Sequence, residues 1–267
     1  MFSKKGATMC NCKKKSFLSQ LYIYHYAKLG FRILLFLGAL VHYVASKVKG
    51  ASLPFGEPNE HTLFWVIVWI FFFSGMVLRL FPSKVETIGC QKLFKHNYVP
   101  TEDEKPSLTS WKSTLALALA WFALNLTFGI LYWTGVFDAG ILVLIALAYG
   151  VCDIVCILFF CPLRDLFLKN KCCADCRIYN WDYAMMFTPF VFIPHVYTWT
   201  LLGMALVLLA IWEVTYKLHP ERFAKNTNAS LACKNCKEKP CRHKKRIEKI
   251  LQSSKEKLEK LSWWKHK

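Results

Sequence analysis

Cysteine residues gather in two groups whose spacing suits metal binding or redox chemistry. The members of the two groups, with one neighbouring histidine, are Cys172, Cys173, Cys176, Cys233, Cys236, Cys241 and His243. Each group contains a C-x-x-C pair, which lets two thiolates from one turn reach a single ion. Two such pairs supply four ligands, the number that suits tetrahedral zinc or the corners of an iron-sulfur cluster. We therefore expect a cysteine metal site, with an iron-sulfur cluster or zinc as the undecided cofactor.

Two other interpretations of these groups stay open. Cys241 and His243 can replace one pair, which would place a Cys3His site entirely within the region 233–243. The thiols can also be free surface groups without a function. Cations beside both groups favour metal binding, because they stabilise thiolates. These cations are Lys169, Lys171, Arg177, Lys234, Lys237, Lys239 and Arg242.

A second set of thiols lies inside an apolar segment. Cys152 and Cys156 are one helical turn apart, Asp153 adjoins Cys152, and Cys161 ends the segment. A row of soft ligands from these thiols to the loop group would suit the passage of a soft metal ion. Cysteine also packs well between helices, and we favour that interpretation. Asp153 requires a partner, because a buried charge in a membrane is costly. The candidate partners are Asn125, His42, Arg79 and His195.

The composition assigns the chain to the integral membrane proteins. Of 267 residues, 55% are hydrophobic and 16% are aromatic, and the mean hydropathy is +0.28. A bilayer core requires roughly twenty consecutive apolar residues per helix. Four segments approach or meet this length with few charges, namely 29–45, 62–81, 113–137 and 140–161. Because very few residues join the last two, we expect them to form a tight antiparallel hairpin.

A further apolar region at 181–216 is long for one helix and short for two. Lys and Arg near spanning helices stay on the cytoplasmic side, so their distribution distinguishes the topologies. Five spans leave 18 of the 35 Lys and Arg residues outside, whereas six spans leave only those at positions 47 and 49. Six spans require a break near Pro194. The predicted fold class is therefore an all-α helical bundle with six spanning segments, or with five plus a re-entrant segment up to His195.

This topology divides the chain into three regions. Residues 1–28 form a basic cytoplasmic leader with an interfacial helix, 29–216 form the transmembrane bundle, and 217–267 form a basic, cysteine-rich cytoplasmic tail. Both termini and both thiol groups then lie in the cytoplasm. In a reducing cytosol, grouped thiols bind metal or do redox chemistry more often than they form disulfides.

The tail and the net charge indicate the partners. The stretch 244–267 predicts a basic amphipathic helix that ends at Trp263 and Trp264. Such a helix suits an anionic inner leaflet, and a solvated helix or short coiled coil is the alternative. The net charge of +18 follows mostly from the positive-inside rule, so we do not expect nucleic acid as a partner. The lipid bilayer is the expected environment.

The cysteine pattern resembles that of quinone-coupled disulfide-forming membrane enzymes. These enzymes pair a C-x-x-C at a helix mouth with a second cysteine pair, and the corresponding residues here are Cys173, Cys176, Cys233 and Cys236. The resemblance implies work on the oxidising side of the membrane. The distribution of Lys and Arg contradicts that side.

The pattern is also similar to that of mercury-transport membrane proteins. Those proteins hold one cysteine pair in a helix and another in a cytoplasmic loop, and the corresponding residues here are Cys152, Cys156, Cys172 and Cys173. The resemblance covers only the cysteines. It implies the transport of a soft metal ion.

Three hypotheses of function follow, and they leave open whether the protein is an enzyme. The first is a multi-pass membrane protein with one shared cytoplasmic-face metal site. An iron-sulfur cluster there would exchange electrons with a quinone or a redox protein, whereas zinc would only tie the tail to the bundle. Tyr179, Trp181 and Tyr183 would line the approach to a quinone-like ring or act as interfacial anchors. The others are a soft-metal ion transporter that uses the intramembrane thiols and a membrane thiol-disulfide oxidoreductase.

Overall fold

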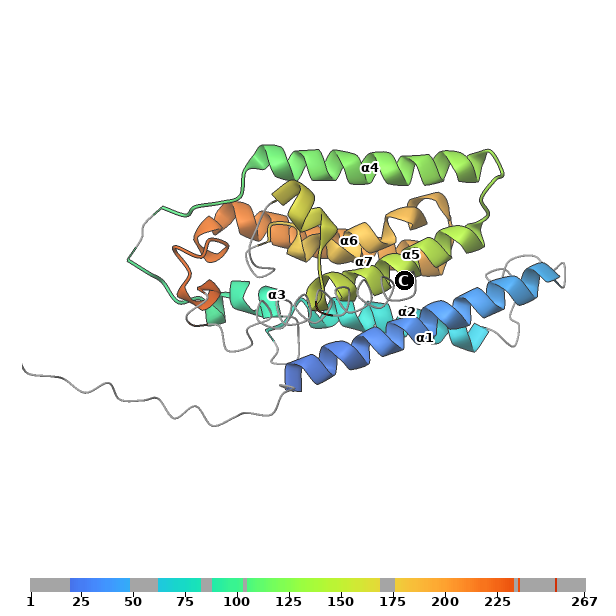
Figure 1. Cartoon of the computed structure of the whole chain (residues 1–267), viewed down its shortest axis with the longest axis horizontal. Coiled ribbons are helices and arrows are strands. Elements are labelled where there is room, and N and C mark those ends of the chain that lie inside the picture. The colour runs from blue at the N-terminus through green and yellow to red at the C-terminus, as the bar shows by residue number, and fades with distance from the viewer. Residues whose placement is uncertain are drawn as a thin grey trace, which may run out of the picture.

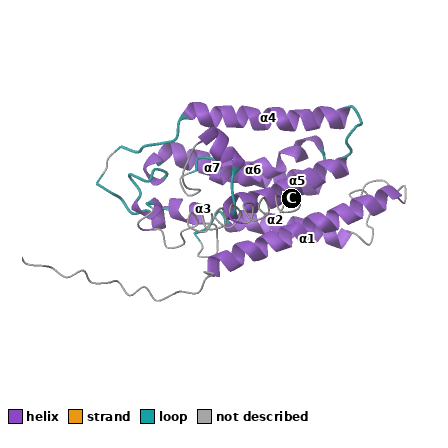
Figure 2. Ribbon diagram, in the orientation of Figure 1, coloured by secondary structure: helices purple, strands orange, loops and turns teal. Residues whose placement is uncertain are grey.

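Helices provide the regular structure of the described chain. The computed structural model describes residues 20–48, 62–82, 88–102, 105–168 and 176–232, together with residues 235 and 253. Across these ranges the regular elements are helical, and strands are absent from them (Figure 2). The all-α prediction is therefore confirmed for this part of the chain.

Five long helices form the bundle. They are α1 (Gln20–Val48), α2 (Thr62–Leu78), α4 (Trp111–Trp133), α5 (Ala139–Leu158) and α7 (Val196–Leu218) (Figure 1). Helices α1, α4, α5 and α7 are long and apolar enough to cross a membrane, and α2 is equally apolar but has 17 residues. These lengths match the thickness of a bilayer core. The fold is therefore that of a multi-helix membrane protein.

Large apolar side chains cover the outside of this bundle. Ile70, Leu119 and Phe122 keep 53%, 59% and 63% of their surface exposed, on α2 and α4. An apolar surface of this kind is costly in water and favourable in hydrocarbon. The outer faces of the helices therefore support a lipid environment.

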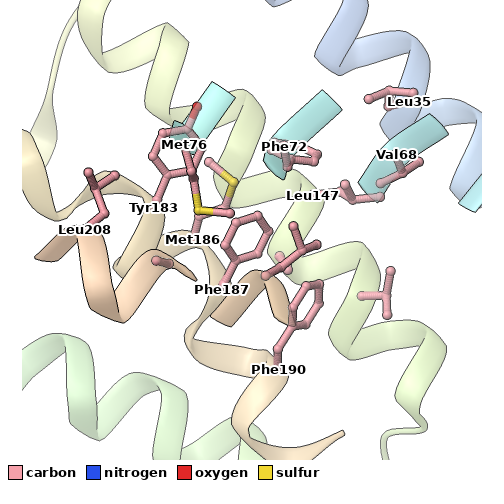
Figure 3. Close-up of a cluster of buried hydrophobic side chains, with 14 of the residues drawn as sticks. Leu35, Val68, Phe72, Met76, Leu147, Tyr183, Met186, Phe187, Phe190 and Leu208 are labelled. Atoms are coloured by element: carbon pink, nitrogen blue, oxygen red, sulfur yellow. The ribbon is translucent and has the colours of Figure 1, made fainter. Parts of the chain in front are cut away.

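The core lies where α2, α5 and α7 meet a short helix, α6 (Asp182–Phe187) (Figure 3). Phe72 of α2 and Phe187 of α6 are each 1% exposed, and their ring centroids lie 5.5 Å apart in an edge-to-face arrangement. Leu147 of α5 and Leu208 of α7 close the cluster from either side. This dense aromatic packing fixes α6 inside the bundle, although the helix has only six residues.

The apolar region predicted at 181–216 contains one full-length helix and one broken segment. The broken segment consists of η4 (Tyr179–Trp181), α6 and η5 (Thr188–Phe192), and it packs along α7. The chain then breaks around Pro194, as predicted, and α7 begins at Val196. His195 caps α7, because its Nδ1 accepts a hydrogen bond from the Tyr197 amide at 3.4 Å. At about 1.5 Å per α-helical residue, the broken segment is shorter than a bilayer core is thick.

The hairpin expected between α4 and α5 has the predicted short connection but not the predicted tight packing. Helix α4 ends at Trp133 and α5 begins at Ala139, with Gly135 at φ +77° in the turn between them. Beyond this turn, α5 packs most extensively on α1, whereas α4 packs on η5 and on the π-helical turn η2 (Arg164–Leu168). The two helices therefore leave room between them, and the site described below occupies it.

Asp138 stabilises the start of α5 and ties it to the end of α1. Its Oδ1 accepts a hydrogen bond from the Ile141 amide at 2.9 Å, and its Oδ2 lies 3.0 Å from Tyr43 Oη and 2.6 Å from Lys47 Nζ. Partial burial raises the pKa of Asp138, but the hydrogen bonds from Lys47, Ile141 and Tyr43 outweigh this effect and hold the pKa below its usual value. The carboxylate is thus charged where it caps the helix dipole.

A folded cap closes the end of the bundle at which α7 ends. It consists of α3 (Ile88–Leu93) with the residues that follow it, and of the stretch 220–231. Asn228 is 0% exposed, and its Nδ2 donates to Lys92 O at 3.1 Å and to Arg222 O at 2.8 Å. Because this asparagine is buried and hydrogen-bonded, its Asn-x-Ser sequence is a poor glycan acceptor in the folded protein.

Candidate functional site

Most of the predicted metal ligands lie outside the described residues. Cys176 is described, and the others are Cys172, Cys173, Cys233, Cys236, Cys241 and His243. The amphipathic helix predicted at 244–267 also lies outside, apart from Ser253. Within the ranges that the structure does describe, no three His, Cys, Asp or Glu side chains come together as a metal site. The cofactor prediction, an iron-sulfur cluster or zinc, therefore stays a prediction.

The intramembrane thiols share one cavity. A space of about 300 Å³ lies between α4, α5 and α6 and is lined by Cys152, Cys156, Cys161 and Cys176. The side chains of Cys156 and Cys161 are in hydrogen-bond contact with each other. Cys176, the described member of the loop group, thus faces the same space as the thiols of α5. The sequence predicted this row of thiols only as the weaker of two interpretations.

Helix geometry explains why these thiols meet. Cys152 and Cys156 lie one turn apart on α5, so both point toward the same side. Helix α5 ends at Leu158, and the chain then turns so that Cys161 comes back beside Cys156. Trp121 of α4 also lines the cavity, and its ring centroid lies 4.6 Å from that of Tyr149 of α5. This aromatic pair joins α4 to α5 beside the cavity.

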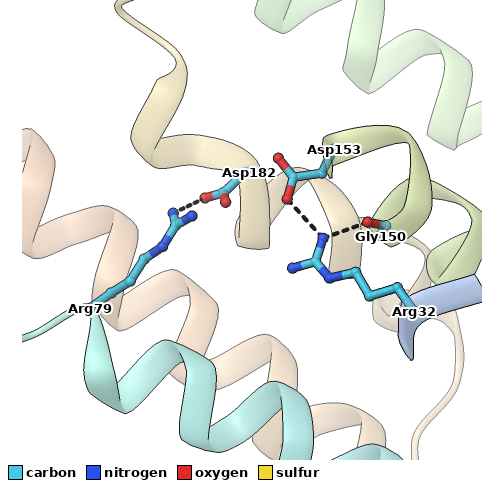
Figure 4. Close-up of polar contacts among 5 residues, drawn as sticks. All are labelled: Arg32, Arg79, Gly150, Asp153 and Asp182. Carbon is cyan, nitrogen blue, oxygen red and sulfur yellow. Dashed lines mark hydrogen bonds and ion pairs between the residues drawn. The ribbon is translucent and has the colours of Figure 1, made fainter. Parts of the chain in front are cut away.

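Two buried ion pairs adjoin this cavity through their carboxylate residues (Figure 4). Arg32 Nη1 of α1 lies 2.8 Å from Asp153 Oδ2 and also donates to the Gly150 carbonyl. Arg79 Nη1, just after α2, lies 2.5 Å from Asp182 Oδ1. Both arginine side chains are 1% exposed. Asp153 and Asp182 line the cavity, and each is paired with a buried arginine.

The predicted partners of Asp153 were wrong. Arg32 is its partner, and Arg79, one of the candidates, pairs with Asp182 instead. Arg32 lies 121 residues away in an apolar segment, and no local pattern connects the two positions. A charge inside a membrane helix does predict that some opposite charge must face it, and Arg32 was the overlooked charge of that kind.

Aromatic rings surround the guanidinium groups. Arg79 lies 4.8 Å from the Tyr183 ring centroid, and Arg32 lies 5.5 Å from that of Phe72. Cation–π contacts of this kind are strong where water is excluded. Tyr183 is 1% exposed and therefore packs against charge instead of lining an open approach. Tyr179 does line the cavity.

Trp181 serves the structure at the loop end of the bundle. Its Nε1 donates to Glu213 Oε1 of α7 at 2.6 Å, and Arg177 pairs with the other oxygen of the same carboxylate. Arg177 also lies over the Tyr216 ring, 3.7 Å from its centroid. These contacts fasten the chain that follows the loop thiols onto α7. The position of Cys176, which lines the cavity, is thus fixed by its neighbours.

The fold and the site together define a polytopic helical membrane protein with an apolar, thiol-lined cavity backed by two buried ion pairs. No family model, no curated protein and no solved structure matches the chain. The function must therefore be argued from the cavity itself.

Proposed function

We propose that the protein binds a soft metal ion through its thiols and passes it through the membrane. The observation that carries this proposal is that Cys152, Cys156, Cys161 and Cys176 all line one cavity. Thiolates are the ligands that select soft ions such as copper(I). The thiols of α5 and the first described thiol of the loop group provide consecutive places for such an ion.

The arrangement suits passage better than permanent storage. A closed tetrahedral set holds an ion tightly, as in structural zinc sites. Passage instead requires several sites that bind strongly enough to admit an ion and weakly enough to release it. The contact between Cys156 and Cys161 offers two thiols at one point, and Cys152 and Cys176 line the same cavity.

The loop and tail cysteines would then form the cytoplasmic end of the path. Under this proposal, Cys172, Cys173 and Cys176 with Cys233, Cys236 and Cys241 take up or deliver the ion. The alternative is that the same cysteines hold a permanently bound zinc ion or iron-sulfur cluster, which is not passed on. Metal and acid-labile sulfide content of protein purified without oxygen distinguishes these two forms.

A cytoplasmic location of both termini is part of this proposal. The start of α1 and the end of α7 lie toward the same end of the bundle (Figure 1), which supports an even number of passes through the bilayer. The broken segment of η4, α6 and η5 then counts as a short sixth crossing or as a re-entrant segment. A reporter fused after Lys267 should report cytoplasm, and a report from outside would contradict the proposed topology.

Uptake of copper(I) into proteoliposomes under reducing conditions tests the path. We expect the double variant Cys156→Ala/Cys161→Ala to lose uptake, because it removes the two thiols that lie in contact. Cys90→Ala is the matched control, since Cys90 is buried in α3 and does not line the cavity. Equal uptake by the double variant and the control would remove the basis of the proposal.

Thiol-disulfide exchange is the second candidate, and the contact between Cys156 and Cys161 is the observation that favours it. One thiolate would attack a substrate disulfide, and the other would resolve the mixed disulfide, leaving a Cys156–Cys161 disulfide and a substrate dithiol. A quinol or a reduced redox protein would then have to supply two electrons and two protons to reduce the Cys156–Cys161 disulfide before the next cycle. A mixed disulfide trapped in the Cys161→Ala variant would support this candidate, and its absence with a disulfide substrate in excess would exclude it.

A further inference from the structure

The walls of the thiol-lined cavity are largely apolar. Trp121 of α4, Ile157 of α5 and Met185 of α6 are among its apolar lining residues. Its volume of about 300 Å³ is at the lower end of the roughly 300–1,000 Å³ found for small-molecule sites. A metal ion needs far less space than this. The shape therefore suits the apolar body of a small lipophilic molecule.

Asp182, one of the residues that line the cavity, has an unsatisfied hydrogen-bond acceptor. The Asp182 side chain is 9% exposed and pairs with Arg79 through Oδ1. Its Oδ2 is buried and accepts no hydrogen bond from any residue that the structure describes. A buried carboxylate oxygen without a donor is destabilising, so a bound molecule that donates a hydrogen bond there would be stabilised.

The local charges select a neutral donor. Asp153 and Asp182 are each paired with an arginine, so the two carboxylates already have their counter-charges. A second cation would leave an excess positive charge in a medium of low dielectric constant, and an anion would face two carboxylates. A hydroxyl group donates a hydrogen bond and adds no charge.

We propose that this cavity binds a lipophilic alcohol or phenol, whose hydroxyl group donates to the carboxylates at Asp153 and Asp182. Its apolar body lies along Trp121 and Met185 and covers Cys156 and Cys161, which line the same cavity. The occupant thereby controls access to Cys156 and Cys161. This inference rests on the carboxylates and the cavity, and it holds whether or not the thiols conduct metal.

Binding of 4-nonylphenol to the full-length protein in detergent micelles tests this inference, by equilibrium dialysis against empty micelles. The matched probe is 4-nonylanisole, which keeps the ring and chain but lacks the O–H donor. We expect saturable binding of the phenol and at least about tenfold weaker binding of the ether, which is the size of effect expected for a hydrogen bond to a charged group. Equal affinities for the phenol and the ether would overturn the proposal that the carboxylates accept a hydrogen bond from the ligand.

Variants locate the probe in the cavity. Met185→Trp fills the space and should abolish binding, whereas Leu119→Trp, on the exposed face of the neighbouring α4, should leave it unchanged. Retention of binding in Met185→Trp would overturn the site. If that variant does not fold, the comparison of 4-nonylphenol with 4-nonylanisole on the wild-type protein still tests whether the hydroxyl group is recognised.

Thiol chemistry separates this inference from the metal proposal. Bound 4-nonylphenol should slow alkylation of Cys156 and Cys161 by N-ethylmaleimide, read by peptide mass spectrometry, because the occupant covers them. The Cys90→Ala variant, whose altered position does not line the cavity, should bind the phenol as well as the wild type does. Unprotected thiols in the presence of saturating phenol would overturn the proposed position of the ligand, even where metal uptake is normal.

Discussion

The Arg32→Met substitution should be among the most destabilising single changes in this protein. It removes a guanidinium that is 1% exposed and that holds Asp153 Oδ2 at 2.8 Å. Asp153, whose side chain is 14% exposed, then stays in the bundle without its counter-charge. Breaking one partner of a buried ion pair costs about 3–5 kcal/mol, mostly because the remaining charge is uncompensated. The free energy of unfolding should fall by this amount.

Titration of the purified protein with dodecyl sulfate in mixed micelles measures this loss. The double variant Arg32→Met/Asp153→Leu should regain at least half of it, since no buried charge is left behind. Lys47→Met is the matched control, because Lys47 is also paired with an aspartate but its side chain is 59% exposed. We expect no measurable loss in that variant.

Two results would refute the reasoning about this pair. Equal stability of Arg32→Met and the control would mean that Asp153 is solvated or protonated without its arginine. Equal instability of the single and double variants would mean that Arg32 acts through packing on Phe72, whose ring lies 5.5 Å from it, and not through charge.

Three further predictions concern packing, capping and the folded cap. Gly129→Ala should destabilise the protein, because a Cβ there would lie 2.3 Å from Phe192 Cζ, whereas Gly203→Ala, with nothing within 4 Å, should stabilise it by about 1 kcal/mol in thermal unfolding. The wild type should be more stable than the Asp138→Asn variant. This difference in the free energy of unfolding should be complete above about pH 4, near the pKa of an unfolded Asp. It should vanish as the pH falls through the lowered pKa of Asp138 in the folded protein. Asn228→Ala should cost about 1–3 kcal/mol, because it removes donors from the Lys92 and Arg222 carbonyls. No loss in Asn228→Ala, or an advantage of Asp138 that persists at the lowest pH, would contradict the respective contact.

Hydropathy and breaking residues predicted much of the helical framework. The apolar segments at 113–137 and 140–161 correspond to α4 and α5, and the break near Pro194 separates η5 from α7. These features depend on the sequence within about twenty residues, which is the length that a helix needs to span a bilayer. The start of α1 at Gln20, ahead of the apolar segment, was missed because the first turns contain Tyr, His and Lys.

The site was harder to predict, because its parts are far apart in the sequence. Cys152 and Cys156 could be placed on one face of a helix from their spacing alone. Whether Cys176 would reach the same space depended on η4 and α6, which are too short to be read from periodicity. The separation of α4 from α5 follows from their packing on other elements, α4 on η2 and η5 and α5 on α1, and the short connection between them did not indicate it.

The pairing of Arg32 with Asp153 also has a consequence for how the chain is made. Ribosomes add roughly 5–20 residues per second, so the 121 residues between the two positions take on the order of ten seconds to synthesise. During that time α1 contains an arginine whose partner has not yet been synthesised. An arginine at the centre of a membrane helix adds about 2.5–3.5 kcal/mol to the free energy of insertion. Helix α1 therefore reaches its final place only when α5 arrives. A chain truncated before Asp153 would lack the counter-charge for Arg32 in α1. We expect such a chain to be recognised and degraded by membrane proteases.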